Sequence, residues 1–159
     1  MREQREKLWS EIEKMDACML VTHDVGGLRA RPMAPMHDAD AGVIRFISRA
    51  QDFKDDEIEA DHDVCLTYAD TADNTYVSVT GAARVLRDRA SVRAHWSEGA
   101  DHWFKDGRND PDAIIIEVTP SQGEYWDISS SDVLVALRIA KAAAAGEQPR
   151  FGKRAKVVL

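Results

Sequence analysis

The first third of the chain combines residue types that bind phosphate groups in proteins. Arg29 and Arg31 alternate within the basic segment LRARPM. Ser48 ends the next apolar segment, and Lys54 opens a short helix that the sequence predicts after it. Arginine and lysine bind phosphate oxygens through charge-assisted hydrogen bonds, and the first backbone N–H groups of a helix have no partner within it. The spacing therefore predicts that cations, a hydroxyl and backbone donors converge on one phosphate.

Each of these residues also has a simpler structural interpretation. Arg29 and Arg31 alone would form a charged, solvated strand face, and Lys54 alone would be an exposed helix lysine. Ser48 could cap the turn that follows it. The phosphate hypothesis therefore depends on one fold bringing all four residues together.

The elements that must position these residues are mainly strands. Alternating apolar and polar residues, with turn residues between the segments, predict strands at 18–22, 28–36, 43–48, 64–68, 76–86, 113–118 and 124–127. Helices are predicted at 2–15, 53–60, 89–96 with Asp88 as N-cap, and 132–145, while 153–159 is a last strand or a tail. Turns are predicted at 26–27 and 120–123. Such strands with peripheral helices favour a sheet closed into a barrel, which protects its edges.

Two prolines mark one predicted strand as unusual. Pro32 and Pro35 lie within 28–36, where each removes a backbone hydrogen-bond donor from the ladder. We therefore expect this strand at an edge of the sheet, or bulged or bent, with freed backbone groups that can face a ligand.

Length and composition limit the function classes. A chain of 159 residues fits one domain at 1–159, with an N-terminal helix at 1–15, a barrel at 17–127 and a C-terminal helix and tail at 132–159. It is too short for separate cofactor and substrate domains, so we expect an active site to need a second subunit. The net charge of −7 disfavours nucleic acid and anionic membranes as partners. Without an apolar run of about 20 residues or a secretory signal, the chain is expected to be cytoplasmic.

Cysteine and histidine spacing predicts neither a metal site nor a disulfide. Cys18 and Cys65 lie in apolar strand-like segments and are expected to be buried, reduced packing residues. The five histidines, at 23, 37, 62, 95 and 102, share no metal-ligand spacing and are expected at the surface. The acidic segment DGRNDPD does not have the arrangement of an EF-hand.

Several motifs in a fixed order resemble the pyridoxamine 5'-phosphate oxidase-like split-barrel superfamily, and within it the general stress protein 26 group. They are RARPM at 29–33, FIS at 46–48 with the following Lys54, YVSVTG at 76–81, DRA at 88–90 with Trp96, WFKDGRNDPD at 103–112 and EYWD at 124–127. The resemblance implies a split β-barrel, mainly β with flanking α, that forms a homodimer with FMN at its interface.

The resemblance also implies which residues contact the cofactor. By position these are Arg29, Ala30, Arg31, Pro32, Met33, Ile47, Ser48, Arg49, Lys54, Tyr76, Trp103, Phe104 and Trp126. Taken alone, the tryptophans and Phe104 would be core or dimer-packing residues. Phe53 stands where the oxidase pattern has a second basic residue, and the oxidase's C-terminal arginine-tryptophan element is not recognisable after Trp126. The first departure leaves phosphate binding to Arg31, Lys54 and Arg49, and the second argues against vitamin B6 oxidation itself.

The implied function is a flavin-dependent oxidoreductase of a small molecule, with an electron donor such as NAD(P)H. A bound flavin supplies the electron chemistry, so its contacts do not identify the substrate, and the sequence nominates no catalytic acid or base. One alternative is a stress-associated protein that stores or senses flavin without turnover. Another is binding of the deazaflavin F420 or of haem in the same barrel.

Overall fold

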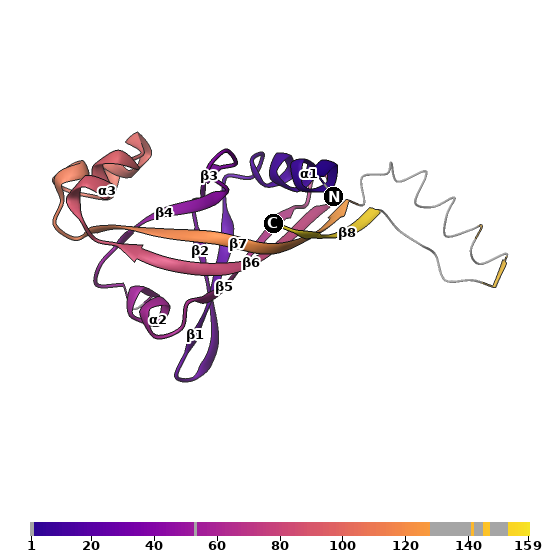
Figure 1. Ribbon diagram of the computed structural model, residues 1–159, viewed down its shortest axis with the longest axis horizontal. Helices are drawn as coiled ribbons and strands as arrows, with labels where there is room; N and C mark the ends of the chain where they lie inside the picture. Colours follow the sequence, from indigo (N-terminus) through magenta and orange to yellow (C-terminus); the bar gives the residue numbers. More distant parts are fainter. Residues whose placement is uncertain (1, 53, 128–140, 142–144, 147–152) are drawn as a thin grey trace.

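The computed structural model describes residues 2–52, 54–127, 141, 145–146 and 153–159. Its strands are β1 Cys18–Asp24, β2 Gly27–Met33, β3 Met36–Asp38, β4 Val43–Arg49, β5 Asp63–Asp70, β6 Thr75–Leu86, β7 Ala113–Asp127 and β8 Lys153–Val158. Its helices are α1 Arg2–Ile12, α2 Lys54–Ala60 and α3 Arg89–Ala94, with the 3-10 helices η1 Glu98–His102 and η2 Gly107–Asn109. The predicted fold class, mainly β with flanking helices in a split barrel, is confirmed (Figure 1).

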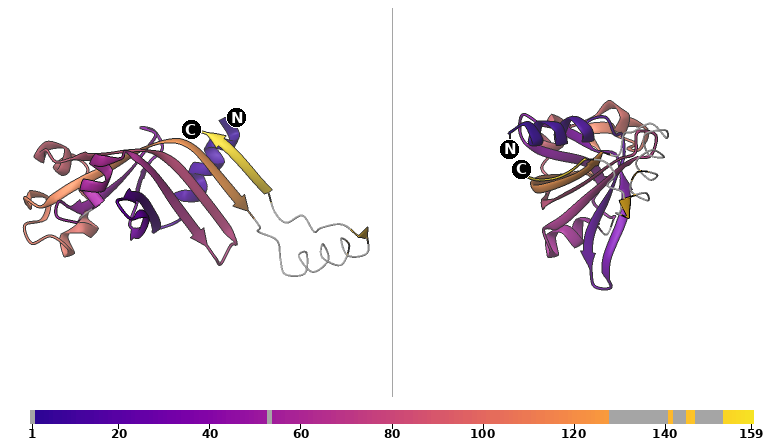
Figure 2. Two further views of the ribbon diagram at one scale, coloured as in Figure 1. Left: turned by 90° about the horizontal axis from the view of Figure 1, so that it is seen from below. Right: turned by 90° about the vertical axis from the view of Figure 1, so that its right-hand side faces the viewer.

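The strands form one twisted antiparallel sheet in the order β2-β1-β5-β6-β7-β4-β3, with β8 paired to β7 (Figure 2). The main core lies on one face of this sheet and is closed by α1. Its buried residues include Leu8, Ile12, Leu20, Phe46, Leu66, Val79 and Ile116. A Cβ at Gly123 would lie 2.4 Å from Leu8 Cδ1, so glycine lets α1 pack closely on β7. The β1–β2 hairpin projects away from α1 (Figure 1).

The ladder between β6 and β7 contains an irregularity that the sequence did not reveal. The predicted turn at 120–123 is wrong, because β7 runs through it without interruption. The register shifts between Thr80 and Gly81, and Pro120 lies at this shift, where its missing N–H breaks no regular ladder bond. A Cβ at Gly81 would lie 2.3 Å from the Thr119 carbonyl oxygen, so this close approach requires glycine.

The predicted strand 28–36 is divided in two. β2 ends at Met33, whereas β3 begins at Met36 and pairs with β4 rather than with β1. Pro35 lies in the break, where its ring removes no ladder donor. β2 is at the edge of the sheet, which is one of the three arrangements predicted for the strand with Pro32. This division leaves the segment between the two strands free to line a pocket.

A second apolar cluster packs against the other face of β7, at the end that carries α3 (Figure 1). It joins Val92 of α3 and Phe104 to Ile115, which alternates with the main-core residue Ile116. The predicted N-cap is confirmed, because Asp88 Oδ1 accepts a hydrogen bond of 2.8 Å from Ser91 N. The final segment forms β8, one of its two predicted outcomes, whereas most of the predicted helix 132–145 lies outside the described residues. No helix of the described part is long and apolar enough to cross a membrane.

Two expectations about single residues need correction. Cys18 is buried as predicted, and burial raises the pKa of its thiol to about 12. Cys65 is only half-buried, because it alternates with Leu66 onto the face opposite the main core, which we call the outer face. His37 is half-buried rather than at the surface. Its Nε2 lies 3.2 Å from the Tyr68 hydroxyl, and burial lowers its pKa.

Candidate functional site

A cavity of about 490 Å³ lies between the end of β2, the end of β4 and the segment around η1. We call it the β4 pocket. Residues predicted to contact the cofactor make up half of its lining, namely Pro32, Met33, Ile47, Ser48, Arg49, Trp103 and Phe104; the others are Ala34, Pro35, Met36, Asp52, Ser97, Gly99 and Ala100. The fold therefore brings together residues from three separate motifs of the chain.

Ser48 supplies an unused polar group on the wall of this pocket. Its side chain is only 5% exposed, and its Oγ has no hydrogen-bond partner among the described residues. A buried hydroxyl without a partner costs about 1–3 kcal/mol, which is why such groups are uncommon in folded proteins. A ligand in the β4 pocket with a hydrogen-bonding group near Ser48 would remove this cost.

Arg49, Trp103 and Phe104 also line the pocket and contact one another. Arg49 Nη2 donates a hydrogen bond to the Trp103 carbonyl oxygen, and its guanidinium lies 4.9 Å from the centre of the Phe104 ring. Trp96 packs edge-on against Phe104 at 5.5 Å between ring centres. The backbone at Trp103 is thus held in place, although the residue is 74% exposed. Trp103 is therefore an exposed aromatic residue among those that line the pocket.

The two arginines of the LRARPM segment lie elsewhere. Arg29 Nη1 is 2.9 Å from Glu57 Oε1, and Arg31 Nη2 is 2.7 Å from Glu57 Oε2. Thr22 completes this group, which we call the Glu57 cluster: its hydroxyl donates to Glu57 and accepts a 2.8 Å hydrogen bond from Arg31 Nη1. Neither arginine is among the residues that line the β4 pocket.

Glu57 is ionised although it is buried. Burial opposes its charge, but hydrogen bonds from Thr22 and Arg31 and the charges of both arginines outweigh this effect and lower its pKa. Sequence reasoning missed both Glu57 and Thr22. Glu57 is one of three acids at the start of α2. The available signal was Thr22, a polar residue that shares the apolar face of β1 with Leu20.

Tyr76, Trp126 and Ala30 are not among the residues that line the β4 pocket. Tyr76 and Trp126 are cross-strand neighbours on the outer face and line a second hollow of about 540 Å³. Pro32 lines both this hollow and the β4 pocket. Ala30 is exposed on β2 and lines neither. Lys54 begins α2, and its side chain lies outside the described part of the chain.

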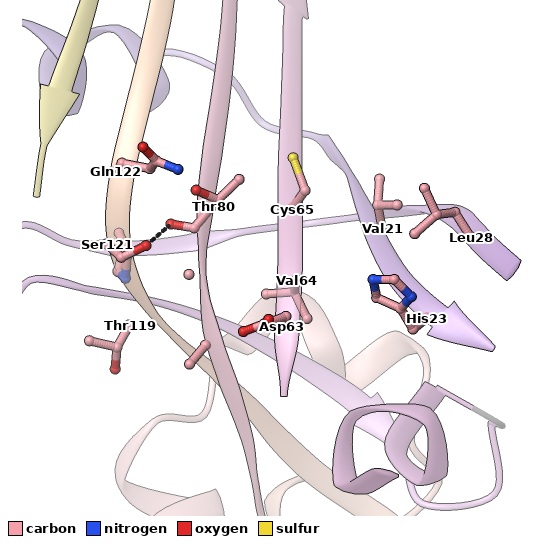
Figure 3. Close-up of a pocket in the computed structure, with 13 residues that line it drawn as sticks. Val21, His23, Leu28, Asp63, Val64, Cys65, Thr80, Thr119, Ser121 and Gln122 are labelled. Atoms are coloured by element: carbon pink, nitrogen blue, oxygen red, sulfur yellow. Dashed lines mark hydrogen bonds between the residues drawn. The ribbon is translucent and has the colours of Figure 1, made fainter. Parts of the chain in front are cut away.

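A third hollow, of about 670 Å³, also lies on the outer face. Figure 3 shows a row of side chains across it, from Val21 through Cys65 and Thr80 to Gln122. These four residues are direct neighbours across β1, β5, β6 and β7. No local motif predicted this hollow, because the hollow results from the order of the strands in the sheet.

Comparison with known proteins agrees with this architecture. Residues 3–150 match the family described as pyridoxamine 5'-phosphate oxidase like. A crystal structure from Jannaschia sp. CCS1, described as a general stress protein 26, has 28% sequence identity and a TM-score of 0.77, with 100% of both chains covered. The general stress FMN/FAD binding protein from Xanthomonas citri shares the fold, with a TM-score of 0.72 and 23% identity over 82% of this chain and 93% of that chain.

A curated relative extends the comparison to a longer protein. Protein bli-3 of Neurospora crassa is 26% identical over 118 aligned positions, and the match covers 67% of this chain and 56% of that protein. The chain thus matches little more than half the length of this relative. The family match, in contrast, covers nearly the whole chain, and the sheet has the order described above. This chain belongs to the pyridoxamine 5'-phosphate oxidase-like family.

Proposed function

We propose that the β4 pocket binds a flavin, specifically FMN, and that the chain is a flavin-dependent oxidoreductase of a small molecule. The observation that carries the proposal is the buried, unpartnered Ser48 hydroxyl on the wall of a cavity of about 490 Å³. The names of two relatives agree with it: the Xanthomonas citri protein is called FMN/FAD binding, and a Nostoc punctiforme relative is called FMN binding.

The chemistry of the pocket fits a flavin. Small-molecule sites commonly have volumes of about 300–1,000 Å³ and apolar walls with a few polar groups. Pro32, Met33 and Phe104 supply apolar contact for a ring system, while Ser48 and Arg49 supply hydrogen-bond donors for a ribityl or phosphate oxygen. When bound, the flavin would supply hydride and electron transfer. The protein would orient it and exclude water.

Retention of the cofactor tests the binding proposal. FMN is added to the purified protein, the sample is desalted, and the visible absorption spectrum is recorded. We expect the wild type to retain flavin and Ser48→Ala to bind FMN about tenfold more weakly, the equivalent of one lost hydrogen bond. Ser121→Ala is the matched control, because its hydroxyl lies at the outer-face hollow. A wild-type protein that retains no flavin would contradict the proposal, and F420 and haem would then be tested in the same way.

Turnover separates an oxidoreductase from a protein that stores or senses flavin. Asp52 is the one acidic side chain among the described residues that line the β4 pocket, and no histidine lines it. We expect the flavin-loaded protein to consume NADH or NADPH continuously when an electron acceptor is present. Reduction that stops after one equivalent per flavin would favour storage or sensing.

We further propose that a second copy of the chain covers the outer face. Three large apolar side chains on or beside this face are exposed, Met19, Leu28 and Val158, and the hollow of Tyr76 and Trp126 adjoins the β4 pocket through Pro32. Methionine and aromatic side chains such as Met19, Tyr76 and Trp126, which line this hollow, are enriched at protein interfaces. Light scattering should give twice the monomer mass for the wild type and a lower mass for Met19→Glu.

A further inference from the structure

We propose that Glu57 is a positioning residue for the β4 pocket: it ties α2 to the β1–β2 hairpin and so fixes the two pocket walls between which the phosphate end of a flavin would lie. This inference rests on the flavin-binding function proposed above. In this proposal, Arg29 and Arg31 affect the pocket indirectly, by holding Glu57 in place.

Both oxygens of the Glu57 carboxylate accept hydrogen bonds from the β1–β2 hairpin. One oxygen accepts from Arg29 at 2.9 Å, and the other accepts from Arg31 at 2.7 Å and from the Thr22 hydroxyl. Arg31 in turn contacts both Glu57 and Thr22. Charge-assisted hydrogen bonds of this kind are short and directional. Glu57 therefore connects one helix to both strands of the hairpin at a single point.

The two segments that Glu57 connects are next in the chain to residues that line the β4 pocket. Arg31 directly precedes Pro32 and Met33, which line one wall. On the other side, α2 follows the turn that starts at Arg49, where Asp52 N donates to Arg49 O at 3.3 Å. Arg49 and Asp52 line the second wall. Along the chain, these two walls are connected through β3 and β4. The Glu57 cluster adds a direct connection between the segments next to them.

A positioning role and a purely electrostatic role of Glu57 predict different effects on phosphate binding. Glu57 cancels one of two arginine charges close to the pocket. If charge alone mattered, neutralising Glu57 would leave more positive charge and would strengthen the binding of a phosphate. If position matters, the same change would weaken it, because the walls would no longer be held at a fixed separation. The two roles therefore predict opposite signs for one substitution.

The test compares Glu57→Gln with Glu117→Gln, a second buried carboxylate between two arginines that lines none of the three pockets described. FMN and riboflavin are titrated into each protein. We expect Glu57→Gln to bind FMN at least about tenfold more weakly and riboflavin less than about threefold more weakly. Glu117→Gln should match the wild type with both ligands. Unchanged or tighter FMN binding by Glu57→Gln, or an equal loss in Glu117→Gln, would overturn the proposal.

A second readout does not depend on flavin. Amide hydrogen exchange of the free protein should become faster at 33–36 and 49–52 in Glu57→Gln but not in Glu117→Gln. If Glu57→Gln does not fold, Glu57→Asp takes its place, because it keeps the charge but is too short to reach both arginines. A wild type that binds neither flavin would defeat the proposed function, and the exchange data would still decide the role of Glu57: unchanged exchange at both segments would refute it.

Discussion

Two carboxylates in this molecule have nearly the same chemistry and different surroundings. The side chains of Glu57 and Glu117 are 7% and 6% exposed, and each pairs with two arginines. Glu117 accepts from Arg45 Nε at 2.7 Å and from Arg84 Nη2 at 2.6 Å. In both cases burial opposes ionisation, and hydrogen bonds and arginine charges outweigh it, so both pKa values are lowered.

The difference lies in what else holds the partners together. Arg45, Glu117 and Arg84 are direct neighbours across β4, β7 and β6, so backbone ladders already fix their positions. Glu57 belongs to a helix of seven residues that no ladder connects to the β1–β2 hairpin. The ion pairs of Glu117 therefore reinforce a strand register that the backbone already fixes. The ion pairs of Glu57 instead determine where α2 lies relative to the β1–β2 hairpin.

The largest expected effect is on global stability and should be similar for the two acids. Glu57→Gln and Glu117→Gln each leave a largely buried arginine with less compensation, and we expect each to lower the free energy of unfolding by about 3 kcal/mol. Urea denaturation measures this. Glu59→Gln, at an exposed side chain bound to Arg87, should cost less than about 1 kcal/mol. A loss below that value for either buried acid would break the comparison.

A smaller effect should distinguish the two arginines within each pair. The Arg31 side chain is 18% exposed and that of Arg29 is 51% exposed. We expect Arg31→Met to lower the free energy of unfolding by about 2 kcal/mol and Arg29→Met by less than about 1 kcal/mol. Likewise, Arg45→Met should lower the free energy of unfolding more than Arg84→Met, because the Arg45 side chain is more buried. Equal losses within a pair would mean that burial does not set the strength of these contacts.

The smallest expected effect is a change in the pH dependence of stability. Because the folded-state pKa values of Glu57 and Glu117 lie below their ordinary value of 4.5, the unfolded chain takes up protons first as the pH falls. Their contribution is complete above pH 4.5 and is lost as the pH falls through the folded-state values. The double variant Glu57→Gln, Glu117→Gln should therefore lose stability less steeply than the wild type below about pH 5. If the stability of the double variant and of the wild type fell equally steeply with pH, the shared electrostatic origin of the two clusters would be contradicted.

Local patterns explain which parts of the fold were predictable. Tyr76, Ser78 and Thr80 alternate with valines, and this predicted β6 because side chains on a strand point alternately to its two faces. Asp88 predicted the start of α3 through a contact three residues away. Pro120 misled the prediction of β7, since a proline is tolerated at a bulge and the bulge depends on β6.

The site was predictable in a different way. Ser48, Arg49 and Trp103 were singled out from motif order, and the structure places all three around one pocket. Their individual roles remain predictions. Arg29 and Arg31 were assigned to a phosphate by residue type; in the fold both pair with Glu57, Arg29 also pairs with Asp24, and Arg31 also donates to the Thr22 hydroxyl. Residue type identified the charges and could not identify what they face.

The sequence by itself determined where most strands lie and the cap of α3, and it limited the strand with Pro32 to an edge, bulged or bent position, because these features depend on sterics and hydrogen bonds between residues close in the chain. The tertiary structure alone decided the partners of Arg31, the continuity of β7 and the shape of the pocket. Glu57 is 26 residues from Arg31 and 35 from Thr22. Contacts over such separations depend on how α2 packs against the hairpin, and that packing results from burial across the whole sheet rather than from any local pattern.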